Sequence, residues 1–226
     1  MLSDEDFQLI EPYLEPVDLP RQTILAEPNR PIDNLYFLEE GLASQIALGE
    51  DGRKLEVGIY GREGAGPMAL LLGVDRTPHL HIIQLGGHGL RISAHALMAL
   101  MDKSRSLRRQ LLAFVYVSMV QTAHTAFSNA SSLVGERLAR WLLMCHDRVD
   151  GDDIAVTHEF LGVMLGVRRT GVTDAIHILE GVGMVRGRRG LINIRDRIKL
   201  EETAGETYGV PESEYLRLLG PMRRPA

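Results

Sequence analysis

Residues 157–190 read THEFLGVMLGVRRTGVTDAIHILEGVGMVRGRRG. Thr157 can begin a helix, because its hydroxyl can accept a backbone N–H of the first turn. Gly166 falls where a tight turn needs a residue that tolerates positive φ. A second helix is predicted over residues 169–180, and two short helices across a glycine turn are typical of a helix-turn-helix. The apolar positions behind this prediction are Phe160, Leu161 and Met164 in the first helix and Val172, Ile176 and Leu179 in the second.

The second helix has a polar side made of Arg168, Arg169, Thr170, Thr173, Asp174 and His177. The first residues of such a helix point at base edges in the major groove of DNA. An arginine there can donate two parallel hydrogen bonds to guanine O6 and N7. A threonine can bond a phosphate or touch a thymine methyl group. The alternative is an ordinary helical hairpin whose polar side only faces water.

Residues 184–194, MVRGRRGLINI, favour a β-hairpin with a basic, glycine-rich tip. A helix-turn-helix followed by such a hairpin is a winged helix, whose wing lies close to phosphates. The predicted DNA-binding residues are Thr157, Arg168, Arg169, Thr170, Thr173 and His177 in the helices and Arg186, Arg188 and Arg189 in the wing.

The segments LGVRRTGVTDAIHILEGVGMV (165–185) and RGRRGLINI (186–194) resemble the Crp/Fnr family of bacterial transcription regulators. The resemblance implies base contacts through an arginine that falls on Arg169. The family often has a glutamate next, where this chain has Thr170, and its later basic contact falls on Asp174. We therefore expect a half-site that differs from the best-known site of the family.

Charge is unevenly distributed along the 226 residues, whose formal net charge is −5. Residues 132–199 carry 11 Lys and Arg against 9 Asp and Glu, and they are the only positive part. This local excess suits a DNA-binding module, while the whole chain is too acidic for indiscriminate polyanion binding. A hydrophobic fraction of 45% indicates a globular protein.

The single cysteine, Cys145, excludes an internal disulfide and a cysteine-only metal or iron–sulfur site, and we expect it to be a small buried hydrophobe. The acidic N-terminus does not resemble a signal peptide. The most apolar run, residues 111–120, is too short to span a bilayer. We expect a cytoplasmic protein that does not enter membranes.

Residues 16–91 alternate short β-prone pieces with Gly, Pro, Asn and Asp, which indicates a small antiparallel barrel or roll. The expected strands are residues 22–25, 34–39, 43–48, 54–59, 80–85 and 89–92. This region resembles the jelly-roll sensor domain of the same family. The resemblance implies a pocket for a cyclic nucleotide, in which a glutamate holds the ribose and an Arg-Ser/Thr pair holds the phosphate. Pro67 stands where that glutamate would be, whereas Arg76 and Thr77 match the phosphate pair.

No cofactor is identified, and cyclic AMP is not expected, because Pro67 has neither an acceptor side chain nor an N–H. Arg76 could hold a different anion, but a solvated loop arginine is the favoured interpretation. His79, His81 and His88 lack a supporting carboxylate or cysteine for a metal, so surface histidines are expected. An enzyme is not expected either, since neither an activated nucleophile nor a phosphate loop is present.

Residues 104–131 predict a long helix with an apolar stripe too wide for a single neighbour. Leu107, Leu111, Phe114 and Ser118 form one row, and Leu112, Val115, Met119 and Ala126 lie alongside it. One side can pack on the roll and the other on a second copy, which makes the helix from Leu107 to Ala126 a candidate for homodimerisation. The alternative is a helix buried within one chain. A dimer would place two recognition helices about 34 Å apart on double-stranded DNA.

The expected fold class is α+β: an antiparallel β jelly roll, a long dimerisation helix and a C-terminal winged helix-turn-helix. The expected domains are a sensor domain (1–103), a dimerisation helix (104–131), a DNA-binding domain (132–200) and a tail of unassigned role (201–226). The predicted function is sequence-specific DNA binding in transcription regulation, with RNA polymerase as a further candidate partner. The alternative is a ligand- or protein-binding sensor module with weakened DNA recognition, which the carboxylate of Asp174 favours.

Overall fold

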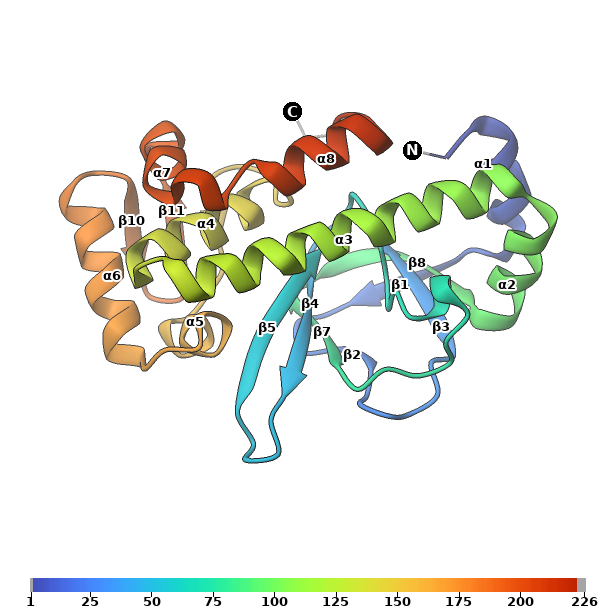
Figure 1. The fold of residues 1–226 in the computed structure, drawn as a ribbon, viewed down its shortest axis with the longest axis horizontal. Helices are drawn as coiled ribbons and strands as arrows, with labels where there is room; N and C mark the ends of the chain where they lie inside the picture. The colour runs from blue at the N-terminus through green and yellow to red at the C-terminus, as the bar shows by residue number, and fades with distance from the viewer. Residues whose placement is uncertain (1, 223–226) are drawn as a thin grey trace.

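The computed structural model describes residues 2–222 and contains an N-terminal β-roll, a long helix and a C-terminal helical domain (Figure 1). The roll consists of two four-stranded antiparallel sheets, with strand orders β1-β8-β3-β6 and β2-β7-β4-β5. Helix α1 (Asp4–Ile10) and the 3₁₀ turn η1 (Glu11–Tyr13) precede it. Its strands are β1 (Glu15–Leu19), β2 (Ile24–Ala26), β3 (Asn34–Leu38), β4 (Leu42–Leu48), β5 (Lys54–Tyr60), β6 (Ala65–Gly66), β7 (Leu80–Leu85) and β8 (Gly87–Ser93).

The interior of the roll contains Tyr60 among aliphatic side chains, and Phe114 of the long helix packs against them. Tyr60 is fully buried and packs so closely on Gly66 that no Cβ would fit there. Phe114, from the long helix, packs in the same way on Gly64. The space between the roll and the long helix is thus occupied by side chains of this chain. The six expected strands are confirmed, with small shifts at their ends.

Helix α3 (Arg105–Ser131) follows α2 (Ala94–Lys103) and runs along the length of the molecule, from the roll to the C-terminal domain (Figure 1). The Ser104 hydroxyl begins it by accepting the N–H of Leu107 at 3.1 Å. Leu107, Leu111 and Phe114 are buried, as the predicted inner row requires. Val115, which lies alongside that row, is also buried against the roll.

By length and composition alone, α3 could cross a membrane, and a third of its most apolar 18-residue window (33%) is buried within the chain. The apolar segment of α3 is therefore longer than residues 111–120, the run that was expected to be too short to span a bilayer. Its remaining apolar surface lies open in the single chain. An exposed apolar surface of this kind marks a contact with another protein or with a membrane.

The C-terminal domain has one apolar core in which α4 (Val134–His146) supports the helix-turn-helix. Gly166 ends the first of the two helices at φ 62°, the left-handed conformation that the sequence predicted. A three-stranded sheet of order β10-β11-β9 completes the domain. Its other elements are α5 (His158–Leu165), α6 (Arg169–Gly181), β9 (Asp153–Ile154), β10 (Val185–Arg188) and β11 (Leu191–Ile194).

The tail returns along the long helix toward the roll. After α7 (Arg197–Ala204) and η3 (Gly205–Thr207), helix α8 (Val210–Leu219) lies beside α3, which the sequence did not predict (Figure 1). The Tyr215 hydroxyl on α8 donates a 2.9 Å hydrogen bond to the carbonyl of Glu63 in the roll. The tail therefore connects the C-terminal domain to the roll.

Candidate nucleic-acid interface

Helix α6 presents a polar side whose predicted residues divide into exposed and engaged groups. Arg168, Arg169, Thr170 and His177 are exposed. Arg168 occupies the position before the first turn and caps it with no side-chain hydrogen bond. The first backbone N–H groups of α6 therefore stay available, and a helix N-terminus with free N–H groups attracts anions such as phosphate.

Two predicted residues serve the fold instead. The Thr157 hydroxyl accepts the N–H of Phe160 at 3.3 Å and so begins α5. The Thr173 hydroxyl donates to the carbonyl of Arg169 at 3.1 Å and lies 3.1 Å from Nδ1 of His158. Both side chains hold the two helices in shape, which leaves them less free to contact DNA than their neighbours.

The wing is fastened to α6 by Glu180. Its Oε1 accepts the backbone N–H of Gly187 at 2.6 Å, which ties the middle of β10 to the end of the recognition helix. Between α6 and the wing lies a cleft of about 490 Å³. It is lined by Arg169 and His177 on one side and by Arg188 and Arg189 on the other.

The arginines of the helix-turn-helix and the wing have free guanidinium groups. Within residues 2–222, no side-chain hydrogen bond or ion pair involves the guanidinium of Arg168, Arg169, Arg186, Arg188 or Arg189. Other arginines of the same domain are engaged: Arg148 pairs with Glu63 at 2.7 Å, and Arg197 pairs with Asp147 at 2.8 Å. Arg195 is likewise exposed and without a side-chain partner in the described residues, so five of the six such arginines of the domain lie on α6 and the wing.

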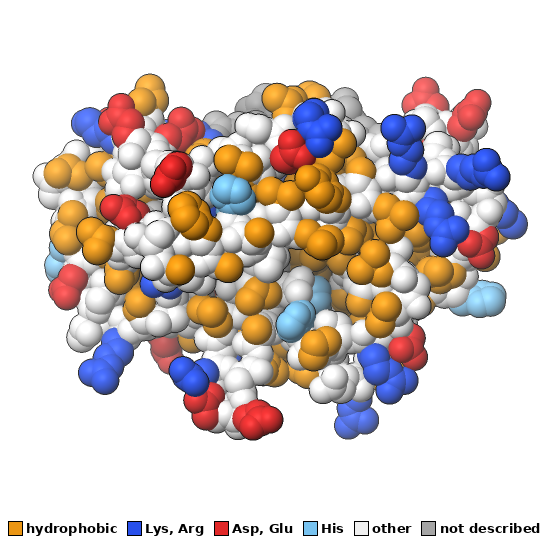
Figure 2. Space-filling model, in the orientation of Figure 1, with side chains coloured by type: hydrophobic (Ala, Val, Ile, Leu, Met, Phe, Trp, Pro, Cys, Tyr) orange, Lys and Arg blue, Asp and Glu red, His pale blue; other side chains and the backbone are white. Residues whose placement is uncertain are grey.

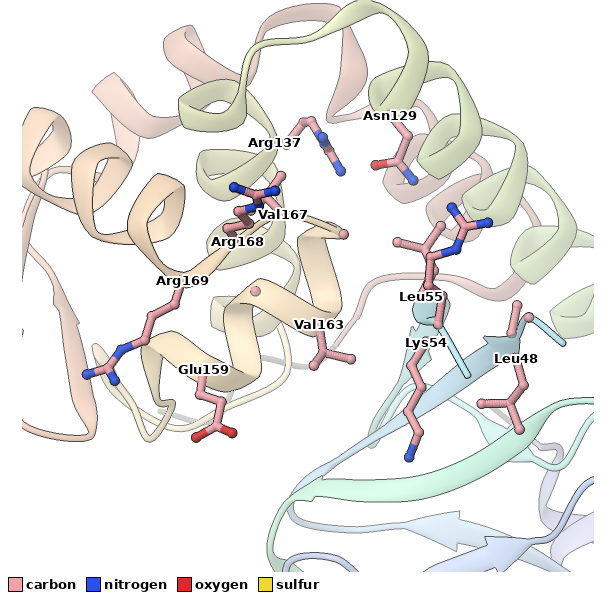
Figure 3. Close-up of a pocket in the computed structure, with 15 residues that line it drawn as sticks. Leu48, Lys54, Leu55, Asn129, Arg137, Glu159, Val163, Val167, Arg168 and Arg169 are labelled. Carbon is pink, nitrogen blue, oxygen red and sulfur yellow. The ribbon is translucent and has the colours of Figure 1, made fainter. Parts of the chain in front are cut away.

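A second and larger cleft, of about 990 Å³, separates the helix-turn-helix from the β4–β5 hairpin of the roll (Figure 3). Leu48 and Leu55 of the hairpin face Val163 of α5 across it. The guanidinium of Arg169 points away from the hairpin, toward the open side of the domain (Figure 3). The hairpin therefore leaves this arginine free to contact DNA.

A buried carboxylate, missed by the sequence analysis, connects the two domains. Glu56 on β5 is only 4% exposed and accepts hydrogen bonds from the Ser44 hydroxyl and from Nε1 of Trp141 on α4, the latter at 2.7 Å. Burial raises the pKa of Glu56 to about 7, although both hydrogen bonds and the charges of Arg140 and Arg148 lower it. The alternation of β5 is that of a strand with Glu56 on its outward face, and the packing of α3 and α4 on that face buries it.

The residues that match a phosphate-binding pair do not meet in the roll. Arg76 is exposed and bonded to its neighbour Asp75 at 3.1 Å, whereas Thr77 is buried and its hydroxyl accepts the N–H of His79. A ligand role for Arg76 and Thr77 stays a prediction.

The histidines of the roll differ in their surroundings. His81 is buried beside the Tyr60 hydroxyl, 3.3 Å away, which corrects the expectation of a surface histidine, and burial lowers its pKa to about 3. His88 is exposed, near Glu39 and Glu40. In the part of the chain that the structure describes, no group of three His, Cys, Asp or Glu could hold a metal ion. Cys145 is fully buried and free, as predicted, and burial raises the pKa of its thiol.

The geometry of the C-terminal domain agrees with a known family. The Crp-like helix-turn-helix domain family matches residues 136–203, which contain α4, the helix-turn-helix and the wing. This part of the chain is therefore similar to a Crp-like helix-turn-helix domain. No curated protein sequence matches the chain.

The fold of the whole chain is similar to the folds of solved transcription regulators. A Crp/Fnr family regulator from Eubacterium rectale has a TM-score of 0.69 at 18% identity, over 90% of this chain and 95% of that one. FixK2 from Bradyrhizobium japonicum has a TM-score of 0.71 at 15% identity, over 85% and 98%. A Crp family regulator from Thermus thermophilus has a TM-score of 0.65 at 20% identity, over 84% and 96%. The predicted α+β architecture is thereby confirmed, and the family model confirms the resemblance to the Crp/Fnr family for residues 136–203.

Proposed function

We propose that this Crp-like protein is a transcription regulator that binds a near-palindromic DNA site as a homodimer. The observation that carries the proposal is the surface of α6 and the wing, where five guanidinium groups have no partner among residues 2–222. In DNA recognition, arginines on the helix read guanine edges and arginines on a wing hold phosphates. We assign the first role to Arg169 and the second to Arg188.

The outer side of α3 supports the homodimer. Five apolar residues with 4-3-4-3 spacing lie on the side away from the roll: Leu112, Tyr116, Met119, Ala123 and Ala126. Met119 is 64% exposed and Tyr116 is 49% exposed. Figure 2 shows hydrophobic side chains gathered over α3 on this face. This spacing is that of a coiled-coil seam, so a second copy of α3 would cover these residues. Two joined copies would present two recognition helices to successive turns of the major groove.

We propose further that DNA binding does not depend on cyclic AMP. The roll is filled by Tyr60 and Phe114, Pro67 lacks an acceptor, and Arg76 is bonded to Asp75. The regulator would act in the cytoplasm, not as an enzyme, by standing beside RNA polymerase at a promoter or in its path.

The test compares Arg169→Ala and Arg188→Ala by fluorescence anisotropy on a duplex selected by the wild type and on a scrambled duplex. Arg169→Ala should cost about 1–3 kcal/mol on the selected duplex only, because a base contact is lost. Arg188→Ala should weaken both duplexes alike and flatten the salt dependence, because a phosphate contact is lost. Arg91→Ala, on the surface of the roll, is the matched control and should change neither. Identical effects of Arg169→Ala and Arg188→Ala on both duplexes would contradict the assigned roles.

A second candidate function rests on Asp174, an exposed carboxylate on the recognition helix. A negative charge near phosphates opposes DNA binding, so the chain could be a sensor module in which DNA recognition is weakened. This candidate predicts equal, weak affinity for all duplexes at moderate ionic strength. A clear preference for one selected duplex would exclude it.

A further inference from the structure

Asp174 lies at the centre of the exposed side of α6. The buried side of the helix consists of Val172, Ala175, Ile176 and Leu179. On the opposite side, Thr170, Asp174 and His177 are exposed at i, i+4, i+7 spacing, which places them on one stripe. In a helix that enters the major groove, this stripe faces the base pairs.

The carboxylate of Asp174 has no structural task. Within residues 2–222 it forms no hydrogen bond and no ion pair, and it caps no helix. Acidic residues elsewhere in the domain are engaged: Glu180 accepts from the wing, and Asp147 accepts from Arg197. An unpartnered carboxylate in the middle of the proposed DNA-facing stripe is costly near phosphates unless it accepts a hydrogen bond there.

The major groove offers few partners to such a group. An ionised carboxylate only accepts hydrogen bonds. Guanine presents the acceptors N7 and O6, and thymine presents the acceptor O4, so both repel it. Adenine places its N6 donor beside the acceptor N7, which repels the second carboxylate oxygen. Cytosine offers its N4 amino group with a C–H beside it, and is therefore the base that suits an aspartate.

We propose that Asp174 is a specificity-determining residue that selects cytosine by accepting a hydrogen bond from its N4 amino group. The inference rests on the proposed function. Asp174 follows Arg169 by five residues, about 7.5 Å along the helix. The cytosine and the guanine read by Arg169 would therefore belong to different base pairs of the same half-site. The carboxylate of Asp174 would thus weaken binding to DNA in general, and its hydrogen bond to cytosine would increase the preference for one base over the others.

Two substitutions distinguish base recognition by Asp174 from the effect of its negative charge on DNA binding. Asp174→Asn keeps the shape of the side chain but adds a donor, and an amide pairs with adenine through N6 and N7. The preferred base at that position should therefore change from cytosine to adenine. Asp174→Ala removes both the contact and the repulsion, so the position should accept all bases. Glu202→Gln is the matched control, because Glu202 on α7 is also exposed and unpartnered among residues 2–222 but lies outside the cleft between α6 and the wing.

The experiment is an anisotropy titration on a duplex that the wild type selects from a random pool, with all four base pairs placed in turn at each half-site position. Wild type should lose about fivefold or more in affinity when the cytosine is replaced. Asp174→Asn should bind best with adenine there, Asp174→Ala should show no preference there, and Glu202→Gln should keep the preferences of the wild type. Unchanged base preferences in Asp174→Asn and Asp174→Ala would overturn the inference alone. Failure of the wild type to prefer any duplex would overturn the proposed function and the inference with it.

Discussion

Nε1 of Trp141 donates a 2.7 Å hydrogen bond to Oε1 of Glu56, which joins the first helix of the DNA-binding domain to strand β5 of the roll. Both side chains are buried, at 4% exposure each. A buried carboxylate needs such partners, because burial without them is costly. The two domains are therefore connected by a polar contact whose strength depends on the protonation of Glu56.

The first prediction concerns pH. The pKa of Glu56 rises from 4.5 to about 7 on folding, so between these values the folded chain binds a proton that the unfolded chain has lost. The contribution of Glu56 to the free energy of unfolding should fall as pH rises through this window, by on the order of 3 kcal/mol. Glu56→Gln should remove this slope. Urea unfolding of both proteins between pH 5 and pH 8 measures it.

The contribution of Glu56 is obtained by subtracting the free energy of unfolding of Glu56→Gln from that of the wild type at each pH. The subtraction is needed because His81 contributes a slope of opposite sign in both proteins. Burial lowers its pKa to about 3, so stability from His81 rises with pH until the unfolded histidine, with its usual pKa of 6.5, has lost its proton. Trp141→Phe is the second variant. It removes one hydrogen bond that lowers the pKa of Glu56, so the slope should extend to higher pH. If the free energy of unfolding changed with pH in the same way in wild type and Glu56→Gln, the protonation of Glu56 would not be coupled to folding.

The turn of the helix-turn-helix gives a second prediction. Gly166 has φ 62°, and a Cβ there would lie 2.9 Å from Cδ1 of Leu55 in the β4–β5 hairpin. Gly166→Ala should therefore destabilise the chain by about 1–2 kcal/mol. Gly135→Ala is the matched control, because Gly135 lies in α4 with open space around its Cα. It should stabilise the chain by about 0.5–1 kcal/mol. Thermal unfolding distinguishes the two, and equal shifts in Tm would be inconsistent with a strained turn.

A third prediction concerns the apolar side of α3. Met119→Glu should make the protein monomeric, because two copies of the new carboxylate would face each other in the proposed seam. The fold of one chain should survive, since Met119 is 64% exposed. Ile24→Glu, at an exposed position of β2, is the control and should leave the oligomeric state unchanged. Sedimentation velocity measures both, and an unaltered dimer in Met119→Glu would place the interface elsewhere.

The fourth prediction is that cyclic AMP leaves DNA affinity unchanged. The reason is that Tyr60 and Phe114 already occupy the interior of the roll. A gel shift with increasing cyclic AMP measures the effect. An affinity shift of about tenfold, equivalent to 1.4 kcal/mol of coupling, would show that the filled roll opens to the nucleotide.

The helix-turn-helix could be predicted from the sequence because its signals are local. Gly166 makes the turn, Thr157 begins the first helix, and Val172 with its helical repeats defines the buried side of the second. Strand β1 was missed because it contains Pro16, which argues against a strand in the middle of a sheet. In the structure β1 pairs only with β8, at an edge where proline is tolerated.

The contacts between domains could not be predicted from local patterns. Helix α8 is stable where it is because Tyr215 packs beside Phe114 and bonds Glu63, residues far away in the sequence. In the alternating pattern of β5, Glu56 occupies a position that would face solvent in an isolated sheet. The packing of Trp141 and its neighbours against the strand buries it. The free arginines of the recognition helix were identified in advance because exposure on the polar side of an amphipathic helix is a local property.

The most direct measurement of the central claim is selection of duplexes from a random pool by the purified chain of 226 residues. The account predicts a two-fold symmetric consensus whose half-site centres lie about 10 base pairs apart, since two copies of α6 must reach successive major grooves on one face of the DNA. A pool that shows no enrichment at moderate ionic strength, or a consensus with a single asymmetric half-site, would contradict it.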